Sequence, residues 1–325
     1  MDKTMDTRLL TKLGTLRQLE TFMKVAEAGS IARAAEELFM TQPAVSIQIK
    51  KLTDALDITL YEVIGKKIYL TEAGHKVVRT GQEVFESIER LDDELNNLKG
   101  LESGTLKIAV VSTAKYFLPH LLGPFYEQFP GIDIEFKVGN RAQILDRLNS
   151  NLDDLYFFSD PPEDLDIKQF EFLPNPIAII ASDKHPLAKK RKLSWSDIEN
   201  ETFLMREEGS GTHNAIQKHL DQEKLQIKKR MIIESNEAIK YSVIANLGIA
   251  MLSAYTLAKE EEEGLTQLPV ATFPILSHWF VVHRSQKKLS IVAQKFLDHV
   301  LHQGKKDLPM NKINAQVKRA LARKA

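Results

Sequence analysis

The sequence contains no cysteine, which excludes disulfide bonds, thiolate metal sites, iron–sulfur clusters and cysteine nucleophiles. It also has no excess charge, because 44 lysines and arginines balance 44 aspartates and glutamates. Bulk charge therefore gives no support to nucleic-acid binding, which would require a locally placed surface. No apolar run resembles a signal peptide or approaches the length of a membrane span, so we expect a cytoplasmic protein.

Signatures of common enzyme classes are also missing. There is no H-E-x-x-H, no G-x-S-x-G and no G-x-x-x-x-G-K-S/T. Paired carboxylates occur at Asp153 and Asp154 and at Asp164 and Asp166, but their flanks are loop-like and solvation explains them. We therefore expect no enzymatic activity, no metal site and no cofactor.

The stretch from Ser30 to Leu56 predicts two short helices separated by a tight turn. We expect Ser30 and Thr41 to be their N-caps. In the second helix, apolar residues recur at spacings of four, three and four, the period of a helix with one buried stripe: Val45, Ile49, Leu52 and Leu56. Taken alone, this pattern also fits an ordinary helical hairpin whose polar face is solvated.

The polar face of the second helix carries amide, hydroxyl and ammonium groups, which can read base edges in a major groove. We expect DNA contacts from this face, from its entrance and from one arginine of the preceding helix: Arg33, Thr41, Gln42, Pro43, Ser46, Ile47 and Lys50.

The flanking segments complete a winged helix-turn-helix. Residues 16–28 have the apolar spacing of a first helix. After Ile58, two β-prone runs flank Gly65, which indicates a hairpin. Lys66 and Lys67 stand at its tip, where they would meet phosphates or reach into the minor groove.

A long helix is predicted from a cap at Thr71 to about Lys99. About 28 residues make a helix roughly 42 Å long at about 1.5 Å per residue. Such a helix is expected to pair with its twin in a second subunit, although it could also pack on its own domain. Its apolar residues form a heptad seam with one weak member, the glycine: Val77, Gly81, Val84, Ile88, Leu91, Leu95 and Leu98.

Strand and helix patterns alternate after Ser103, which predicts an α/β fold with largely parallel sheets. Roughly 200 residues are too many for one small sheet, so we expect two lobes. The chain is expected to cross between them at 174–176 and to return after Pro274. Strands are expected at 106–111, 132–138, 175–181, 230–234, 248–253 and 278–283.

The expected organisation is therefore an all-α winged helix-turn-helix domain, a linker helix and an α/β effector half. The boundaries are an N-terminal extension (1–15), the DNA-binding domain (16–73), the linker helix (74–102), the effector-binding domain (103–303) and a basic tail (304–325). Lobe 1 is expected at about 104–174 and 276–303, and lobe 2 at about 175–275. A frayed end explains the tail, with DNA contact as the alternative.

With these parts in this order, the chain resembles the LysR-type transcriptional regulators from about Leu16 to His302. The most specific segments are F-M-K-V-A-E-A-G-S-I-A-R-A-A-E-E-L-F-M-T-Q-P-A-V-S (22–46) and L-T-E-A-G (70–74). The resemblance implies specific binding to double-stranded DNA with dyad half-sites, a homodimer or homotetramer, and no membrane association. It also implies two lobes like those of periplasmic binding proteins, with a small-molecule effector between them.

A narrower resemblance lies in the effector half. Its motifs, such as N-R-A-Q-I-L-D-R-L (140–148), P-P-E-D-L-D (161–166), G-S-G-T (209–212) and S-N-E-A-I-K (235–240), are similar to those of regulators of the RuBisCO operon and carbon dioxide fixation. The implied effector is a small anionic metabolite, such as a phosphorylated sugar or acid. The alternatives are a regulator of another metabolic operon and a solute-binding receptor.

Three positions depart from the family pattern. Val63 replaces the usual arginine of the wing, and Ile47 replaces an arginine that often follows the serine of the reading helix. Arginine also commonly follows G-S-G-T, where this chain has His213. A permanently charged fork thus becomes a group that titrates near neutrality, which weakens the expectation of strong anion binding there.

Two helix entrances have chemistry suited to an anion, because hydroxyls and backbone N–H groups at helix N-termini bind anions. If the lobes face each other, both entrances line one cleft. Two arginines and the histidine would supply counter-charge, and the residues at 235 and 236 would orient the ligand. The candidate effector contacts are Ser112, Thr113, Lys115, Asn140, Arg141, Arg206, Gly209, Ser210, Gly211, Thr212, His213, Ser235 and Asn236. Taken alone, G-S-G-T is equally a turn and helix cap.

Overall fold

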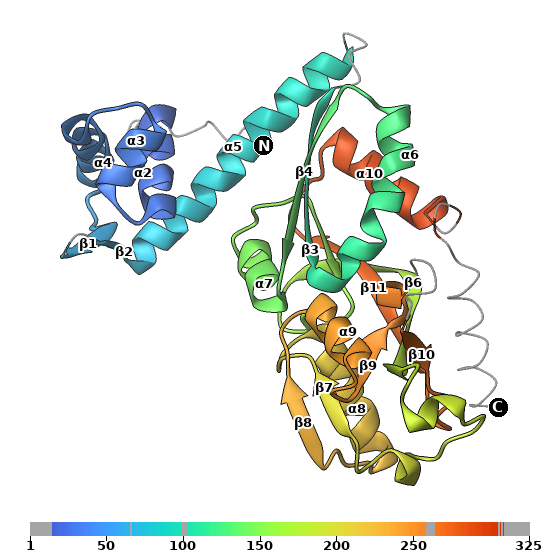
Figure 1. Ribbon diagram of the computed structural model, residues 1–325. Coiled ribbons are helices and arrows are strands. Elements are labelled where there is room, and N and C mark those ends of the chain that lie inside the picture. Colours follow the sequence, from blue (N-terminus) through green and yellow to red (C-terminus); the bar gives the residue numbers. More distant parts are fainter. Residues whose placement is uncertain are drawn as a thin grey trace. The chain divides into compact units, whose positions relative to one another are not determined.

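The computed structural model in Figure 1 describes residues 15–65, 67–98, 103–257, 264–304, 306 and 308. The chain divides into two compact units, Met1–Asp92 and Asp93–Ala325, which we treat separately. Within the described ranges, no helix is both long and apolar enough to cross a membrane.

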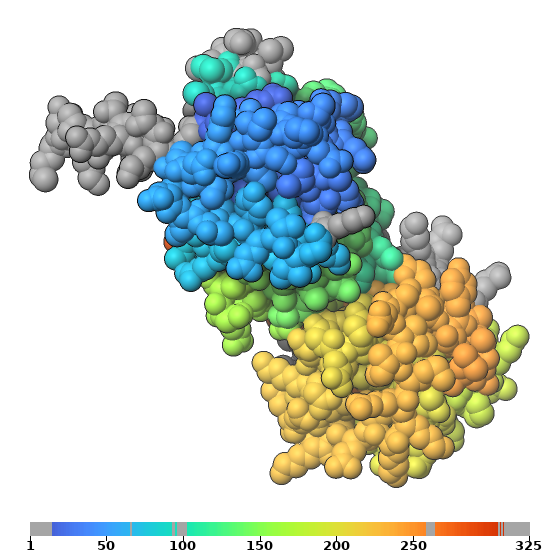
Figure 2. Space-filling model, turned by 90° about the vertical axis from the view of Figure 1, so that its left-hand side faces the viewer, coloured from blue at the N-terminus to red at the C-terminus, as the bar shows by residue number. Residues whose placement is uncertain are grey.

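The N-terminal unit contains the predicted winged helix-turn-helix, which is drawn in blue in Figures 1 and 2. Its elements are helices α2 (Leu16–Ala28), α3 (Ile31–Glu37) and α4 (Gln42–Leu56) and strands β1 (Tyr61–Ile64) and β2 (Lys67–Leu70). One face of each helix, together with the residue that precedes β1, contributes to a common core: Phe22, Val25, Ala34, Ala35, Val45, Ile49, Leu52 and Leu60. The predicted apolar stripe of α4 is therefore confirmed.

Both predicted N-caps of this unit are confirmed as the N-cap residues of their helices. The Thr41 hydroxyl accepts a hydrogen bond from the backbone N–H of Ala44 at 3.4 Å. Ser30 occupies the N-cap position of α3, but its side chain makes no capping hydrogen bond. The serine therefore has the extended backbone of an N-cap without the usual side-chain contact.

The wing is an antiparallel hairpin with a tight turn after Ile64. Ile64 pairs with Lys67 across the antiparallel strands, and Gly65 has the positive φ of 65° that such turns require. Lys67 is exposed but begins β2 rather than standing in the turn, so its predicted place is off by one residue. Lys66 lies outside the described residues.

Helix α5 (Glu72–Leu98) begins as predicted, because the Thr71 hydroxyl accepts a hydrogen bond from the Gly74 backbone N–H at 3.1 Å. Ile88, Leu91 and Leu95 are exposed along it, which leaves an apolar stripe on its surface. The last seam residue, Leu98, lies outside the described side chains.

Gly81 is not simply a weak member of that seam. It is buried where α5 packs on α2, and a Cβ atom at this position would lie 2.6 Å from Met23 Sδ and 3.1 Å from Leu19 Cδ1. The glycine therefore permits the close approach of the two helices.

Replacing Gly81 by alanine is expected to destabilise the protein by about 1 kcal/mol, because overpacking outweighs the usual helix gain of about 1 kcal/mol. Urea unfolding measures this change. Thr80→Ala, on the exposed side of the same turn, should change stability by less than about 0.5 kcal/mol. A more stable Gly81→Ala variant would contradict the close contact between α5 and α2.

The second unit contains one nine-stranded sheet with strand order β4-β3-β5-β11-β6-β9-β7-β8, and β10 pairs with β6. The strands are β3 (Gly104–Val111), β4 (Ile132–Gly139), β5 (Leu155–Phe158), β6 (Ile167–Ser182), β7 (Thr202–Met205), β8 (Lys229–Ile232), β9 (Ile249–Ser253), β10 (Leu265–Gln267) and β11 (Ile275–Arg284). The α-helices are α6 (Leu118–Gln128), α7 (Arg141–Asn149), α8 (Gly211–Glu223), α9 (Asn236–Ile244) and α10 (Ile291–His302). Short 3-10 helices are η1 (Ser112–Tyr116), η2 (Pro186–Lys189), η3 (Trp195–Asp197) and η4 (Ala254–Leu257).

Two long antiparallel strands join the lobes. The predicted crossing at 174–176 lies inside β6, and the predicted return after Pro274 is β11, which pairs with β6 along its whole length. The pairings of β3 with β4 and β5, and of β7 with β8 and β9, are parallel. Strands β5 and β11, β6 and β9, and β6 and β10 pair antiparallel, so the sheet is mixed rather than largely parallel as predicted. Each lobe has its own apolar cluster, and Ala254 and Tyr255, which follow β9 of lobe 2, pack into the cluster of lobe 1.

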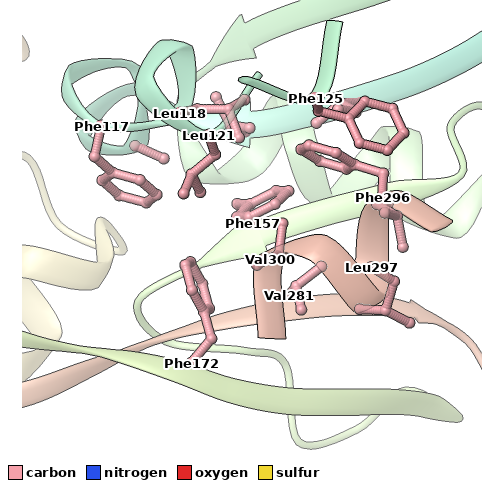
Figure 3. Packing of buried hydrophobic residues seen from close by; sticks show 14 of the residues in the cluster. Phe117, Leu118, Leu121, Phe125, Phe157, Phe172, Val281, Phe296, Leu297 and Val300 are labelled. Carbon is pink, nitrogen blue, oxygen red and sulfur yellow. The ribbon is translucent and has the colours of Figure 1, made fainter. Parts of the chain in front are cut away.

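Lobe 1 has an aromatic core beneath α6 and α10. Figure 3 shows Phe125 of α6 facing Phe296 of α10, with ring centroids 5.0 Å apart and an edge-to-face geometry. Leu308 is also buried in this cluster, although most of the predicted basic tail lies outside the described residues.

Strands β5, β7 and β10 were not predicted. All four residues of β5 are buried, and three of the four in β7 are. Such short strands lack the alternation of apolar and polar residues that identifies a half-exposed strand.

Candidate DNA-binding surface and effector cleft

The reading face of α4 is exposed. Gln42, Pro43, Ile47 and Lys50 are exposed, and Ser46 is half-buried between them. Because residues four apart share one face of a helix, the side chains at 42, 46 and 50 form one row, with 43 and 47 beside it. This row fits the width of a major groove, which admits one helix.

Two further candidate DNA contacts, Thr41 and Arg33, lie outside this row. The Thr41 hydroxyl caps α4 as an acceptor, which leaves its hydrogen to donate elsewhere. Arg33 is exposed on α3, the helix that crosses the backbone in this motif. The DNA-binding roles of all these residues remain predictions.

Sequence reasoning missed Phe39. Its side chain is 97% exposed in the turn between α3 and α4, and its φ of 52° is in the left-handed region. An aromatic residue rarely takes that backbone conformation, which favours asparagine or glycine.

Phe39→Asn is therefore expected to stabilise the protein by about 1 kcal/mol, because asparagine tolerates a positive φ. Urea unfolding measures the gain. Glu36→Asn, at an exposed helical position nearby, should not stabilise. Equal or lower stability of Phe39→Asn would show that the backbone is not strained there.

In the second unit, the predicted helix entrances lie at one edge of the sheet. The 3-10 helix η1 follows the carboxyl end of β3, and Ser159 follows β5. Helices α8 and α9 begin from the other lobe, with Ser210 and Ser235 as their side-chain N-caps.

Arg206 joins the two lobes at this edge. Its side chain is only 3% exposed, and its Nη1 donates to Asn236 Oδ1 at 2.9 Å, while Nη2 donates to Ser112 Oγ at 3.4 Å. Asn236 Nδ2 in turn donates to Thr113 Oγ1 at 3.1 Å. The Arg206 fork also binds both carboxylate oxygens of Glu207, at 2.7 and 2.6 Å.

A small cavity lies beside Arg206, with a volume of about 10 Å³, room for about one water molecule. The first turn of α8 contributes to its wall, so backbone N–H groups with partial positive charge lie beside it. The lining residues come from both lobes: Val111, Ser112, Thr113, Arg141, Ser159, Arg206, Ser210, Gly211 and Thr212. A Cβ atom at 211 would collide with Ser159 Oγ, so glycine permits this close approach.

Further interlobe contacts flank the cavity. Lys115 Nζ lies 2.7 Å from Glu237 Oε1, and the Tyr116 hydroxyl donates to the same oxygen at 2.7 Å. Asn214 of α8 donates to Asp160 Oδ2 at 2.6 Å. Within lobe 1, Arg141 also binds Asp160, through the Asp160 carbonyl oxygen at 3.1 and 3.3 Å and the Asp160 carboxylate at 3.5 Å.

The structure therefore brings together most of the predicted effector residues. Those around the cavity and its network are Ser112, Thr113, Arg141, Arg206, Ser210, Gly211, Thr212 and Asn236. The carboxylates that neutralise the cations, Asp160, Glu207 and Glu237, were missed. Their sequence signal is weak because acidic residues are common throughout the chain.

Four predicted contacts lie elsewhere. Asn140 is exposed and caps α7, accepting from the Gln143 N–H at 2.9 Å. Gly209 is exposed in a turn with a φ of 80°. His213 is half-buried and does not line the cavity, and Ser235 caps α9. These positions shape the entrances rather than the cavity wall.

The interpretation of Asp153 and Asp154 as solvated loop residues is wrong. Asp153 is 2% exposed and accepts from Arg147 Nε and Nη2 at 2.8 and 2.7 Å. Asp154 accepts from the Lys107 backbone N–H at 2.9 Å. Both carboxylates hold the loop between α7 and β5, and no group of metal ligands was found among the described residues. Asp164 and Asp166 are exposed, as expected.

The contact that Glu237 makes between the lobes depends on pH. Burial alone raises the pKa of this carboxyl group, but hydrogen bonds from Lys115 and Tyr116 outweigh it and lower the pKa to about 2. Because the ordinary value is 4.5, the carboxylate stabilises the fold above that pH and loses this effect as the pH falls towards 2.

We expect Glu237→Gln to flatten the loss of stability below about pH 4.5, by less than about 1 kcal/mol because the group is partly exposed. Urea unfolding at a series of pH values measures the effect. Glu208→Gln, at an exposed position, should retain the parent profile. Identical profiles for the parent and Glu237→Gln would contradict the assignment.

A winged helix-turn-helix joined by a long helix to a two-lobed unit with an interlobe cavity defines the class of ligand-responsive DNA-binding regulators. Comparison with known families agrees: residues 16–75 match the bacterial regulatory helix-turn-helix protein, lysR family, and residues 99–305 match the LysR substrate binding domain. The chain belongs to the LysR family. It is therefore a transcriptional regulator and not an enzyme.

Several relatives are similar along most of the chain. The HTH-type transcriptional activator CmpR of Synechocystis sp. is 48% identical, with 89% of this chain and 95% of the relative covered. The RuBisCO operon transcriptional regulator of Acidithiobacillus ferrooxidans is 40% identical, with 88% and 93% covered. The solved regulatory domain of Synechocystis CcmR, in complex with 2-PG, is 42% identical with a TM-score of 0.58, and the match covers 61% of this chain and 95% of that one.

Proposed function

We propose that this LysR-type regulator senses 2-phosphoglycolate or a closely related phosphorylated acid and controls genes of carbon dioxide fixation. The relatives named above support the regulon, and the CcmR regulatory domain with 2-PG supports the ligand. The observation that carries the proposal is the buried Arg206 fork beside the N-terminus of α8. A guanidinium fork and a helix N-terminus are both suited to a phosphate or carboxylate.

The cleft offers complementary groups for both ends of such a ligand. Arg206 and Arg141 carry positive charge on opposite lobes, and the hydroxyls of Ser112, Thr113 and Thr212 line the space between them. Because the cavity of about 10 Å³ is much smaller than a metabolite, binding requires the lobes or their side chains to move. A ligand that favours one lobe arrangement would shift the population of DNA-binding states.

Calorimetric titration of the full chain with 2-phosphoglycolate tests this proposal. Glycolate, inorganic phosphate, ribulose bisphosphate and 2-oxoglutarate serve as comparison ligands. We expect saturable binding of 2-phosphoglycolate and at least ~10-fold weaker binding of glycolate, which lacks the phosphate. Specific DNA binding without affinity for any of these anions would instead favour a regulator of another metabolic operon.

We also propose that α5 pairs with a second copy and that the pair addresses two half-sites in the cytoplasm. The exposed Ile88, Leu91 and Leu95 support this pairing. Sedimentation of Leu91→Lys should show dissociation relative to the parent chain, whereas Glu89→Lys at an exposed position of the same turn should not. An unchanged mass for Leu91→Lys would place the dimer contact elsewhere.

A further inference from the structure

Three cations of the cleft are each matched by a carboxylate of the chain itself. Arg206 pairs with Glu207, Arg141 with Asp160, and Lys115 with Glu237. An anionic effector that binds these cations therefore competes with carboxylates that already occupy them. Which carboxylate the effector displaces depends on the other hydrogen bonds that each carboxylate makes.

Two of the three carboxylates also hold the lobes together. Asp160 of lobe 1 accepts from Asn214 of lobe 2, and Glu237 of lobe 2 accepts from Tyr116 of lobe 1. Displacing either carboxylate breaks a second hydrogen bond between the lobes. These two carboxylates are therefore poor candidates for exchange with a ligand.

Glu207 differs from them. Within the described part of the chain, its carboxylate bonds only with Arg206, through the two charge-assisted contacts at 2.7 and 2.6 Å. Its side chain is 20% exposed, while that of Arg206 is 3% exposed and is also held by Asn236. Glu207 can thus rotate into solvent while the guanidinium stays in place.

We propose that Glu207 is a built-in competitor for the effector and restricts it to ligands that carry a phosphate. This inference rests on the proposed function of the cleft. A ligand carboxylate that replaces the Glu207 carboxylate gains no charge or hydrogen bond on Arg206, and it must overcome the high effective concentration of a tethered group. A phosphate carries a charge of about −1.5 to −2 and three acceptor oxygens. It therefore makes a stronger charge-assisted contact with Arg206 than the Glu207 carboxylate does, whereas a ligand carboxylate only matches it.

The discriminating variant is Glu207→Gln, which removes the competing charge but keeps the shape and one acceptor oxygen. The matched control is Glu208→Gln, because the neighbouring Glu208 is exposed and its loss changes the net charge equally. The parent and both variants are titrated with 2-phosphoglycolate and with 2-oxoglutarate, which carries only carboxylates. Thermal unfolding of each variant checks that it is folded.

For Glu207→Gln we expect 2-phosphoglycolate and 2-oxoglutarate each to bind on the order of ten-fold tighter than to the parent, because a tethered competitor lowers the available fraction of Arg206 by the same factor for every ligand. Glu208→Gln should stay within about two-fold of the parent. If the parent binds 2-phosphoglycolate and Glu207→Gln binds it no tighter, the role of Glu207 as a competitor is wrong, while the proposed function still holds. If neither chain binds it, the proposed function fails as well.

A crystal structure of the parent with 2-phosphoglycolate provides a second test that needs no variant. We expect phosphate oxygens within about 3.2 Å of the Arg206 nitrogens, and Glu207 oxygens beyond about 4 Å from them. A bound ligand beside an intact Arg206–Glu207 pair would show that the carboxylate is a structural partner and not a competitor.

Discussion

Replacing Gln42 by alanine is expected to cost about 1–3 kcal/mol of discrimination between specific and non-specific DNA, the usual size of a base-edge contact. Gln42 is exposed at the first residue of α4, and helix N-terminal residues reach the bases in this motif. Ser46→Ala, one turn further on, is expected to have an effect in the same range. Competition between specific and random DNA at fixed salt measures both.

A second pair of variants separates recognition of the bases from electrostatic attraction to the DNA phosphates. Lys67→Ala, in the wing, should weaken binding to all sequences alike and reduce the slope of log K against log salt by about 1. Lys51→Ala serves as the control for loss of a charge on α4 outside the predicted reading row. If Gln42→Ala and Ser46→Ala both leave discrimination unchanged, α4 is not the recognition helix.

Arg206→Ala should weaken binding of 2-phosphoglycolate by about 2–5 kcal/mol, which is at least ~30-fold. The buried fork is lost, and with it the charge-assisted hydrogen bonds that the guanidinium would make to the ligand phosphate in place of Glu207. Calorimetry measures the affinity, and thermal unfolding shows how much of the loss reflects the fold.

The control for this variant is Arg191→Ala, because Arg191 is exposed and does not line the cavity. It should bind 2-phosphoglycolate as the parent does. Unchanged affinity of a folded Arg206→Ala variant would contradict the placement of the ligand in this cleft.

Local patterns determined how much of the fold was predictable. Helix α4 was predictable because its buried residues repeat with the helical period, and α5 because Thr71 and a long apolar repeat mark it. Strands β5 and β7 carry no such pattern, because nearly every residue in them is buried. The packing role of Gly81 was not predictable, because its contact with Leu19 and Met23 of α2 depends on the tertiary structure.

The residues of the candidate cleft were likewise predictable only in part. Ser112, Thr113 and the start of α8 were predictable, since the ends of parallel strands and the starts of helices gather at one edge of a sheet. The carboxylates that pair with the cations were not, because which acidic residue meets which cation depends on the tertiary placement of loops. Asp153 was misread for the same reason: its burial depends on Arg147 of another element.

A phosphorylated metabolite that acts through Arg206 is expected to change how this regulator binds DNA. The most direct test selects binding sites from a random DNA pool and then measures affinity and footprint at fixed salt, with and without 2-phosphoglycolate. We predict dyad-symmetric sites and a shift in affinity or footprint length that is lost in Arg206→Ala. Specific binding that is indifferent to 2-phosphoglycolate in the parent chain would contradict the account.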